Sequence, residues 1–472
     1  MYFIGLEEDK VDIELSKMDG KIKQGRTSSC NHKADGACIY CTSKDPYDPE
    51  YLKKEGIKFM SFHSYLRKID HEKGSLAKAN LDEINLTIKS GCTTHAPWPE
   101  GICSACQPPA LTLNRQTYRH VDHITFENGD IVDNFLNFWR VTSHQRAGIL
   151  YGRYETFNGV PLGIQAVVSA IYEPGQQGTR DSIKLFPDED GKQAQVDRIA
   201  KSLGLCRIGW IFTDLVQKDT SGKVKHVRHA DSHYLSAQEC ITAANFQNMY
   251  PNITKKSSSL QFGSKQVTIV VTGDTENQIA LEAYQVSQQC MAMVRAGVLL
   301  PTKDAPELGY VREPKSGPNL DVFYKVKDQY GNEVTKVARP LPVEYLLIDI
   351  PSGFSSASPT YSMSLEKAFF SDAIKKPFPI ENRPMEGQLQ TIEALANYRK
   401  MFDIDNISDF FRDFHLLIYL CAQTDVPLTE EDMKPLLEAI RDRRLEEVYR
   451  WTEGHQWKTL ELIMNNIVDG FQ

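Results

Sequence analysis

The chain has 472 residues and a mass of 53.5 kDa, and 41% of its residues are hydrophobic and 25% charged, so it can form roughly two to four folded domains. Its formal net charge of −8 and its pI near 5.9 give no general attraction to a phosphate backbone, which argues against nucleic acid as a partner. No apolar stretch reaches the roughly 18 residues of a membrane span, and the acidic opening is unlike a signal peptide, so we expect a cytoplasmic or nuclear protein without direct membrane insertion.

The first 28 residues alternate charged and apolar side chains without a clear period. We expect residues 1–28 to form an edge strand or a lead-in to the first domain, and we assign them no function. From residue 29 to 118 the chain is rich in Cys, His, Gly and Pro, with one short helical pattern from Phe59 to Ile69. Since its apolar content is thin, this segment needs cross-links in order to fold.

Six of the ten cysteines lie in this segment and form two similar sets. The first set is Cys30, His32, Cys38 and Cys41, and the second set is Cys92, His95, Cys103 and Cys106. In each set a Cys-x2-Cys turn brings two thiolates to one tetrahedral ion, and a nearby Cys and His supply the other ligands. Pro97 and Gly101 suit the tight turns that this convergence requires. Four protein ligands leave no open position for water, so we predict two zinc-finger modules with one structural zinc ion each.

The choice of histidine ligand stays open in this segment. The single residue between Cys30 and His32 is a tighter spacing than usual, and other histidines could replace either chosen one. These other candidates are His63, His120 and His123. The remaining cysteines lie singly in apolar surroundings, and we expect them to be buried thiols: Cys206, Cys240, Cys290 and Cys421.

From residue 119 to 350 the sequence changes to apolar runs that are typical of buried strands. These runs are GILYGRYE, GIQAVVSAIYEP, RIGWIFTD, VTIVVTGD and EYLLIDI. Two helices are predicted between them, from Gln193 to Leu203 and from Ser236 to Asn248, and Ser236 and Glu239 match a capping box. The stretches KKSSSL and PSGFSSASPTYS are predicted to be loop-like insertions. The pattern predicts an α/β or α+β domain over residues 119–350.

The last part of the chain, residues 351–472, is predicted to be mostly helical after about residue 385. Aromatic and aliphatic residues recur there near helical spacing, and a second apolar stripe follows an N-cap candidate at Thr429. The first group is Phe410, Phe411, Phe414, Leu417 and Tyr419, and the second is Met433, Leu436, Leu437 and Ile440. Because such stripes need a partner face, we expect these helices to pack against the central domain.

Several longer stretches resemble one known family closely. These are SSCNHKADGACIYC, FMSFHSYLRK, GCTTHAPWPEGICSACQPPALTLNRQTYRHVDHITFEN, GWIFTDL, ECITAANFQN, ELGYVREP, RPLPVEYLLIDI and PFPIEN. From about residue 29 to 472 the chain resembles the nuclear protein localization protein 4 family. Members of that family also carry an N-terminal ubiquitin-like domain, which the first 28 residues do not match, so we expect this sequence to begin after that domain.

This resemblance implies a non-enzymatic cofactor. It would bind polyubiquitinated proteins, join ubiquitin fusion degradation protein 1, and deliver its clients to the valosin-containing-protein AAA ATPase for unfolding and proteasomal degradation. It also implies that the protein is found in the cytoplasm and nucleus, and that partners hold it at the endoplasmic reticulum and nuclear membrane. The zinc modules would sit on the ATPase ring, and the other domains would present surfaces to ubiquitin.

The central region also resembles the MPN fold of metalloprotease deubiquitinases. Active members place a Glu before a GILxG-type strand, then a Gly-Trp-x-His-x-His segment and a later Ser-x-x-Asp. Here these positions hold Gln145, Phe212, Asp214 and Glu239. Phe212 cannot bind a metal and Gln145 cannot take a proton from water, so the resemblance predicts an inactive MPN-like domain with no catalytic residue.

Two other functions were weighed against the adaptor. An active zinc-dependent isopeptidase could use His226, His229 and His233 of KHVRHADSH, although the charged neighbours of these histidines favour a solvated loop. A zinc-dependent nucleic-acid binder is disfavoured by the net charge.

Overall fold

The computed structural model describes most of the chain. The described residues are 7–25, 30–31, 38, 41–73, 81, 83–89, 91–97, 100–219, 221–312, 321–328, 330–354, 377–385, 389–403, 407–422 and 428–469. The predicted ligand His32 and most of the predicted insertion PSGFSSASPTYS lie outside them. None of the helices in these residues is long and apolar enough to cross a membrane.

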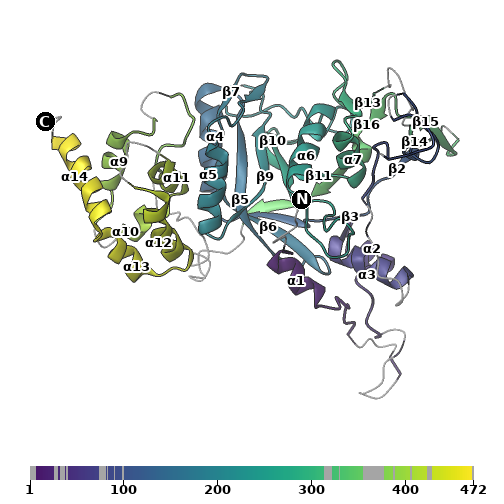
Figure 1. The fold of residues 1–472 in the computed structure, drawn as a ribbon, viewed down its shortest axis with the longest axis horizontal. Helices are drawn as coiled ribbons and strands as arrows, with labels where there is room; N and C mark the ends of the chain where they lie inside the picture. The colour runs from purple at the N-terminus through teal and green to yellow at the C-terminus, as the bar shows by residue number, and fades with distance from the viewer. Residues whose placement is uncertain are drawn as a thin grey trace.

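An eight-stranded mixed sheet forms the centre of the molecule (Figure 1). Its strands, in spatial order, are β17 (Leu347–Ile350), β11 (Ile279–Val286), β10 (Val267–Gly273), β9 (Cys206–Thr213), β5 (Ala147–Phe157), β6 (Gly163–Tyr172), β4 (His123–Phe126) and β18 (Ser352–Phe354). Neighbours β9 and β10 are parallel, as are β4 with β6 and β18, and the other pairs are antiparallel. The predicted strand runs are therefore confirmed, except that EYL of EYLLIDI belongs to a 3-10 helix, Val343–Leu346.

Both faces of this sheet are covered, which explains why its strands read as continuous apolar runs. Successive side chains alternate between two cores: Ile149 and Tyr151 face one, and Leu150 faces the other. Helix α4 (Asp130–Thr142) covers the second face. Three helices cover the first: α5 (Lys192–Ser202), α6 (Ala237–Met249) and α7 (Gln288–Arg295). The predicted helices and the capping box at Ser236 are confirmed in α5 and α6.

Smaller sheets flank the large one. They are β1 (Met60–Ser61) with β3 (Tyr118–Arg119), β12 (Leu299–Pro301) with β13 (Leu308–Val311) and β16 (Leu341–Pro342), β15 (Glu333–Val337) with β14 (Val322–Lys327) and β2 (Leu111–Leu113), and β7 (Gln176–Gly178) with β8 (Ile183–Leu185). The hairpin β14–β15 lies at the end of the molecule opposite the C-terminal helices (Figure 1). The insertion KKSSSL is a loop, as predicted, whereas Ser352–Phe354 of the second insertion is a strand.

The N-terminal segment forms a helix, α1 (Lys10–Ser16), and not the edge strand that was one of the two expectations. Val11 and Leu15 are buried against the large sheet, and Asp12 binds His63 of α3 (Phe62–Lys73) and Lys265 at the start of β10. A second short helix, α2 (Pro49–Lys54), begins at an Asp48 cap. The edge-strand alternative was wrong because the buried residues Val11 and Leu15 lie four apart, on one side of a helix.

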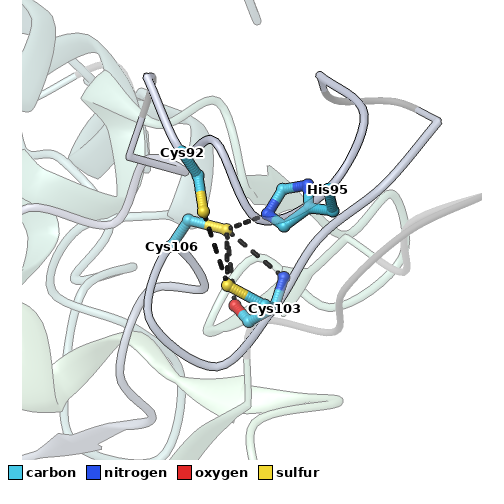
Figure 2. A group of neighbouring side chains, drawn as sticks. All are labelled: Cys92, His95, Cys103 and Cys106. Carbon is cyan, nitrogen blue, oxygen red and sulfur yellow. Dashed lines mark hydrogen bonds between the residues drawn. The ribbon is translucent and has the colours of Figure 1, made fainter.

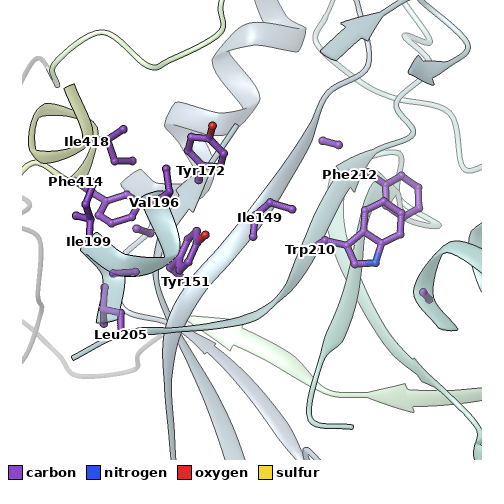
Figure 3. Packing of buried hydrophobic residues seen from close by; sticks show 14 of the residues in the cluster. Ile149, Tyr151, Tyr172, Val196, Ile199, Leu205, Trp210, Phe212, Phe414 and Ile418 are labelled. Atoms are coloured by element: carbon purple, nitrogen blue, oxygen red, sulfur yellow. The ribbon is translucent and has the colours of Figure 1, made fainter. Parts of the chain in front are cut away.

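The C-terminal part is helical and packs on α5, as expected. Its helices are α9 (Ile392–Arg399), α10 (Ile407–Phe410), α11 (Phe414–Ala422), α12 (Glu430–Arg441), α13 (Leu445–Thr452) and α14 (His455–Asp469). Phe414 lies beside Tyr151 of β5, with 5.6 Å between ring centroids, and one apolar cluster includes both (Figure 3). Thr429 caps α12 together with Asp432, which confirms the predicted N-cap.

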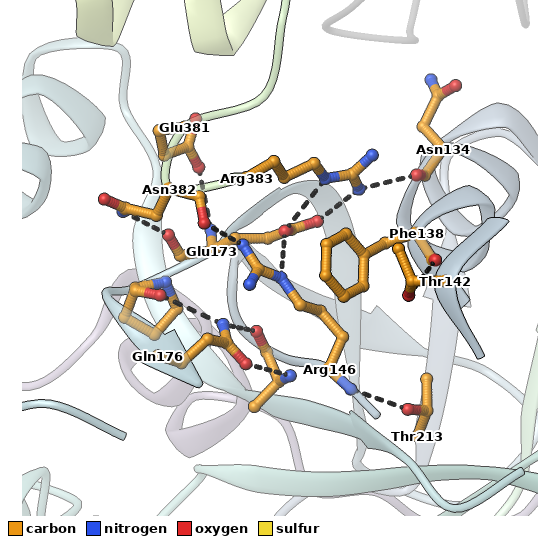
Figure 4. A network of polar contacts seen from close by, with 12 residues as sticks. Asn134, Phe138, Thr142, Arg146, Glu173, Gln176, Thr213, Glu381, Asn382 and Arg383 are labelled. Atoms are coloured by element: carbon orange, nitrogen blue, oxygen red, sulfur yellow. Dashed lines mark hydrogen bonds and ion pairs between the residues drawn. The ribbon is translucent and has the colours of Figure 1, made fainter. Parts of the chain in front are cut away.

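A buried network of charges joins the sheet to the C-terminal helices through the segment 377–385 (Figure 4). Glu173, at the end of β6, accepts hydrogen bonds from Arg146 Nε at 2.5 Å and from Arg383 Nη2 at 2.5 Å. The Glu173 amide donates to Glu381, and the Glu381 carboxylate also contacts His415 Nδ1 of α11 at 2.7 Å. The members of this network are far apart in the chain, so no local sequence pattern predicts it.

The network predicts that stability falls in mildly alkaline solution. Burial alone would lower the pKa of His415, but the Glu381 carboxylate, helped by Asp413 and Glu173, raises it to about 8. The protonated ring therefore stabilises the fold fully below its unfolded pKa of about 6.5, and this contribution is lost as the pH rises through about 8. We expect a loss of about 1.5 kcal/mol in the free energy of unfolding between pH 6.5 and 8.5.

Denaturant unfolding across this pH range measures the loss. The His415→Gln variant, which cannot titrate, should show a flatter dependence on pH than the unchanged chain. Equal slopes for the two proteins would contradict the assignment to His415.

Candidate functional site

The structure brings three cysteines of the first set together. Cys38 Sγ lies 3.7 Å from Cys30 Sγ and 3.8 Å from Cys41 Sγ. A tetrahedral zinc ion with Zn–S bonds of about 2.3 Å separates neighbouring sulfurs by about 3.8 Å. The three thiols therefore have the spacing of three corners of a zinc tetrahedron. The fourth predicted ligand, His32, lies outside the described residues.

All four predicted ligands of the second set converge (Figure 2). Cys103 Sγ lies 3.7 Å from Cys92 Sγ and 3.5 Å from Cys106 Sγ, and His95 Nε2 lies 3.0 Å from Cys106 Sγ. His95 Nδ1 is 2.7 Å from the carbonyl oxygen of Ala96. Since that nitrogen donates its proton to the carbonyl, the lone pair of Nε2 is left for the shared centre, which is the usual arrangement of a zinc-bound histidine.

The two Cys-x2-Cys turns have the same local structure. The amides of Cys38 and Cys103 each donate to the sulfur three residues later, at 3.3 Å in both turns. The amides of Cys41 and Cys106 donate back to the carbonyls of Cys38 and Cys103. Near the second turn, the Thr94 hydroxyl donates to Cys103, which lowers the pKa of that thiol to about 6 and favours the thiolate that zinc requires. Both sets therefore fit a tetrahedral zinc ion.

The alternative histidines are not beside the thiols. His63 is buried and contacts Asp12 Oδ1 at 2.8 Å, His120 is buried 4.2 Å from the ring of Phe62, and His123 stacks on Phe157. Among the described residues, the two groups of three or more potential metal ligands are these two cysteine sets. None of the three alternatives therefore replaces a ligand of the second set, and none lies in the first.

Gly101 is needed for close contact and not only for a turn. A Cβ atom at this position would lie 2.8 Å from the Ala96 carbonyl oxygen and 3.0 Å from His95 Nδ1. These two atoms form the hydrogen bond that orients the histidine ring. The absence of a side chain at Gly101 therefore leaves room for the orientation of His95.

Three of the four scattered cysteines are buried, as predicted: Cys240, Cys290 and Cys421. Cys206 is exposed at the start of β9, so the expectation for it was wrong. An apolar sequence neighbourhood did not bury it because it lies at the end of the strand, before the covered part begins.

The positions that the protease resemblance assigns to catalysis line a pocket of about 360 Å³. Gln145 uses both ends of its amide inside the fold. Its Nε2 donates to the carbonyls of Arg180 and Leu215, and its Oε1 accepts from the Thr213 hydroxyl and the Leu215 amide. No hydrogen-bonding capacity remains for a water molecule, so Gln145 has a structural role.

Phe212 stacks on Trp210 as part of the pocket wall, with 4.7 Å between ring centroids. Asp214 and Glu239 do converge, as the resemblance suggests, but on the guanidinium of Arg228. Burial alone would raise the pKa of Glu239, and Arg228 lowers it below its usual value instead. Arg228 was missed in the sequence because KHVRHADSH was interpreted as a solvated loop. The signal that could have indicated Arg228 is the pair of acidic residues Asp214 and Glu239, which need a cation if they are brought together.

The three histidines of the isopeptidase hypothesis do not converge on one centre. His226 and His229 lie side by side, with 5.4 Å between ring centroids, and His226 Nδ1 contacts the Gly273 carbonyl. His233 contacts Ser232 instead. In the part of the chain that is described, these three side chains do not form a group of metal ligands.

Comparison with known proteins gives the family. Residues 6–143 match a model of the zinc-binding region of the NPL4 family, and residues 146–465 match the model of the NPL4 family itself. The chain belongs to the NPL4 family. The resemblance seen in the sequence is thereby confirmed, and the zinc-binding region of the family contains both cysteine sets.

Curated relatives match over nearly the whole chain. The nuclear protein localization protein 4 homolog of Drosophila melanogaster is 51% identical over 97% of this chain and 69% of its own length. The human homolog is 48% identical over 98% of this chain and 74% of its own length. Nuclear protein localization protein 4 of Saccharomyces cerevisiae is 37% identical over 97% of this chain and 80% of its own length.

We predict two tightly bound zinc ions per chain, one in each cysteine set, because the sulfur spacings fit this ion. The Cys103→Ser variant should lose one ion and become sensitive to proteases over residues 90–118, since metal binding supplies much of the folding energy of such a segment. Metal analysis and limited proteolysis measure both effects. The Cys206→Ser variant should keep both ions, and a Cys103→Ser protein with unchanged metal content would contradict the assignment.

We also predict that the Gly101→Ala variant binds its second zinc ion about 10-fold more weakly, because the new methyl group displaces the contact between His95 and Ala96. Competition with a chelator measures this affinity. Gly129→Ala is the control, since a Cβ atom there meets nothing within 4 Å. Equal zinc affinity in the two variants would show that the orientation of His95 is unimportant.

Proposed function

We propose that the protein is a non-enzymatic cofactor that binds polyubiquitinated proteins. Together with ubiquitin fusion degradation protein 1, it would deliver them to the valosin-containing-protein AAA ATPase for unfolding and proteasomal degradation. Membership of the NPL4 family supports a cofactor role. The relatives are named for nuclear protein localization, which is consistent with a place in the nucleus, and we expect the protein in the cytoplasm as well.

The side chains that line the protease-like pocket are the observation that carries the non-enzymatic part of this proposal. Hydrolysis by a metalloprotease needs a metal with an open position and a general base. Gln145 has no basic group and is fully hydrogen-bonded, and Phe212 has no ligand atom. An inactive MPN-like domain, which would keep the shape without the chemistry, accounts for both substitutions.

A groove between α4 and the first part of the C-terminal region is our candidate surface for ubiquitin. Asn134 and Asn137 of α4 line one side, residues of the 377–401 segment line the other, and the volume is about 620 Å³. Leu389 and Met401 are exposed in it. Exposed apolar side chains in a concave surface are typical of protein-binding sites.

The zinc modules would provide a second surface. The helices and strands around them, α2, α3 and β2, lie on the opposite side of the sheet from α9–α14 (Figure 1). A client could therefore be held at one end while the zinc modules contact the ATPase ring at the other. Structural zinc suits this role because it fixes loops that have little core of their own.

We predict that the chain retains polyubiquitin without cleaving it, with or without added zinc. Loss of the base alone removes a factor of about 10² to 10⁴ in rate, and the metal ligand at Phe212 is lost as well. Incubation with defined polyubiquitin chains, followed by pull-down and gel analysis, measures binding and cleavage together. Release of monoubiquitin that a chelator stops would establish the alternative, an active isopeptidase.

The groove has its own test. The variant Leu389→Ser with Met401→Ser should weaken polyubiquitin binding at least about 10-fold, since central apolar contacts dominate such interfaces. Tyr330→Ser is the control, because Tyr330 is a large side chain that is even more exposed, at 79% against 56% for Leu389 and 50% for Met401, but lies at the tip of the β14–β15 hairpin. Equal losses in the two proteins would exclude the groove as the binding surface.

A further inference from the structure

Three charged side chains from three separate segments meet at the edge of the 360 Å³ pocket. Asp214 follows β9, Glu239 lies in the first turn of α6, and Arg228 comes from the loop between them. The guanidinium is almost fully buried, with 2% of the Arg228 side chain exposed. Buried charges of this kind are retained only when they are paired and hydrogen-bonded.

Four hydrogen bonds hold the guanidinium of Arg228 in place. Its Nε donates to Asp214 Oδ2 at 2.7 Å, and Nη1 and Nη2 donate to the two oxygens of Glu239 at 2.9 and 2.7 Å. Nη1 also donates to the carbonyl of Tyr234 at 2.7 Å. The charged group lies 5.6 Å from the ring centroid of Phe212. Four of its five N–H groups are therefore used within the pocket wall.

The position of the Arg228 guanidinium is incompatible with a catalytic metal ion between Asp214 and Glu239. The resemblance to metalloproteases assigns Phe212, Asp214 and Glu239 to metal-ligand positions, so a metal would need the space where the two carboxylates point. Arg228 fills that space with a charge that is permanent at any physiological pH. The residues present therefore do not fit a metal ion, which would meet a cation at its own site and an aromatic ring in place of one ligand.

We propose that Arg228 is the fixed cation of this pocket: its guanidinium takes the place of a divalent ion, neutralises Asp214 and Glu239, and holds the 226–239 loop as a pocket wall. Glu239 contributes twice, because the same carboxylate accepts from the Ser236 amide and so caps α6. One ion cluster thus fixes the end of β9, the loop and the start of α6. The pocket keeps its shape without metal.

Replacing Arg228 alone tests this role. The Arg228→Met variant leaves two partly buried carboxylates without their cation, so the melting temperature should fall by at least about 5 °C and hydrogen exchange should accelerate over residues 226–239. Arg140→Met is the control, since Arg140 pairs with Asp133 on the surface of α4 and its loss should change neither measurement.

A triple variant distinguishes charge neutralisation from packing. Arg228→Met combined with Asp214→Asn and Glu239→Gln removes all three charges and should recover at least half of the lost melting temperature; where the single variant does not fold, the triple variant should fold and unfold cooperatively. A triple variant as unstable as the single one would overturn the proposal. So would binding of Mn²⁺ by the unchanged chain that the Asp214→Asn, Glu239→Gln variant loses, because the pocket would then hold a metal beside Arg228.

Discussion

The buried ion pairs of Glu173 connect the central sheet to the segment that leads into the C-terminal helices. Glu173 directly follows strand β6, and its carboxylate is buried together with the side chains of Arg146 and Arg383 that bind it. A buried carboxylate costs several kcal/mol unless it is paired, so neither arginine can leave without a penalty. Through Arg383 and Glu381 the same cluster reaches α11. Buried charges therefore help to fix the segment 377–385 between the sheet and the C-terminal helices.

A buried charged group also pairs with residues from distant segments at two other places in the fold. Asp12 joins the N-terminal helix to His63 and Lys265, and Arg228 joins a loop to the pocket. In each place one buried charged group contacts partners that are distant in sequence. Ion pairs of this kind define which segments meet, whereas the apolar cores supply most of the stabilising energy.

The features that follow from local pattern were predictable. Apolar runs gave the strands, the Ser236 and Thr429 caps gave helix starts, and the cysteine spacings gave two sets of converging thiols. The features that depend on distant contacts were not. The pairing of Glu173 with Arg383 spans 210 residues, and the burial of Arg228 depends on carboxylates from two other elements. Sequence reasoning treats such charged residues as solvated, because that is their usual environment.

One apolar cluster runs without a break from one end of the protein to the other. It includes Leu86 and Leu113 near the second cysteine set, buried residues of α5, α6 and α7, and Trp457 and Met464 of α14. A continuous core of this kind is packed about as densely as a molecular crystal and has low compressibility. Because dense cores transmit strain, we expect a shift of the side chains near the second cysteine set to be passed on to α14 through the packed residues between them.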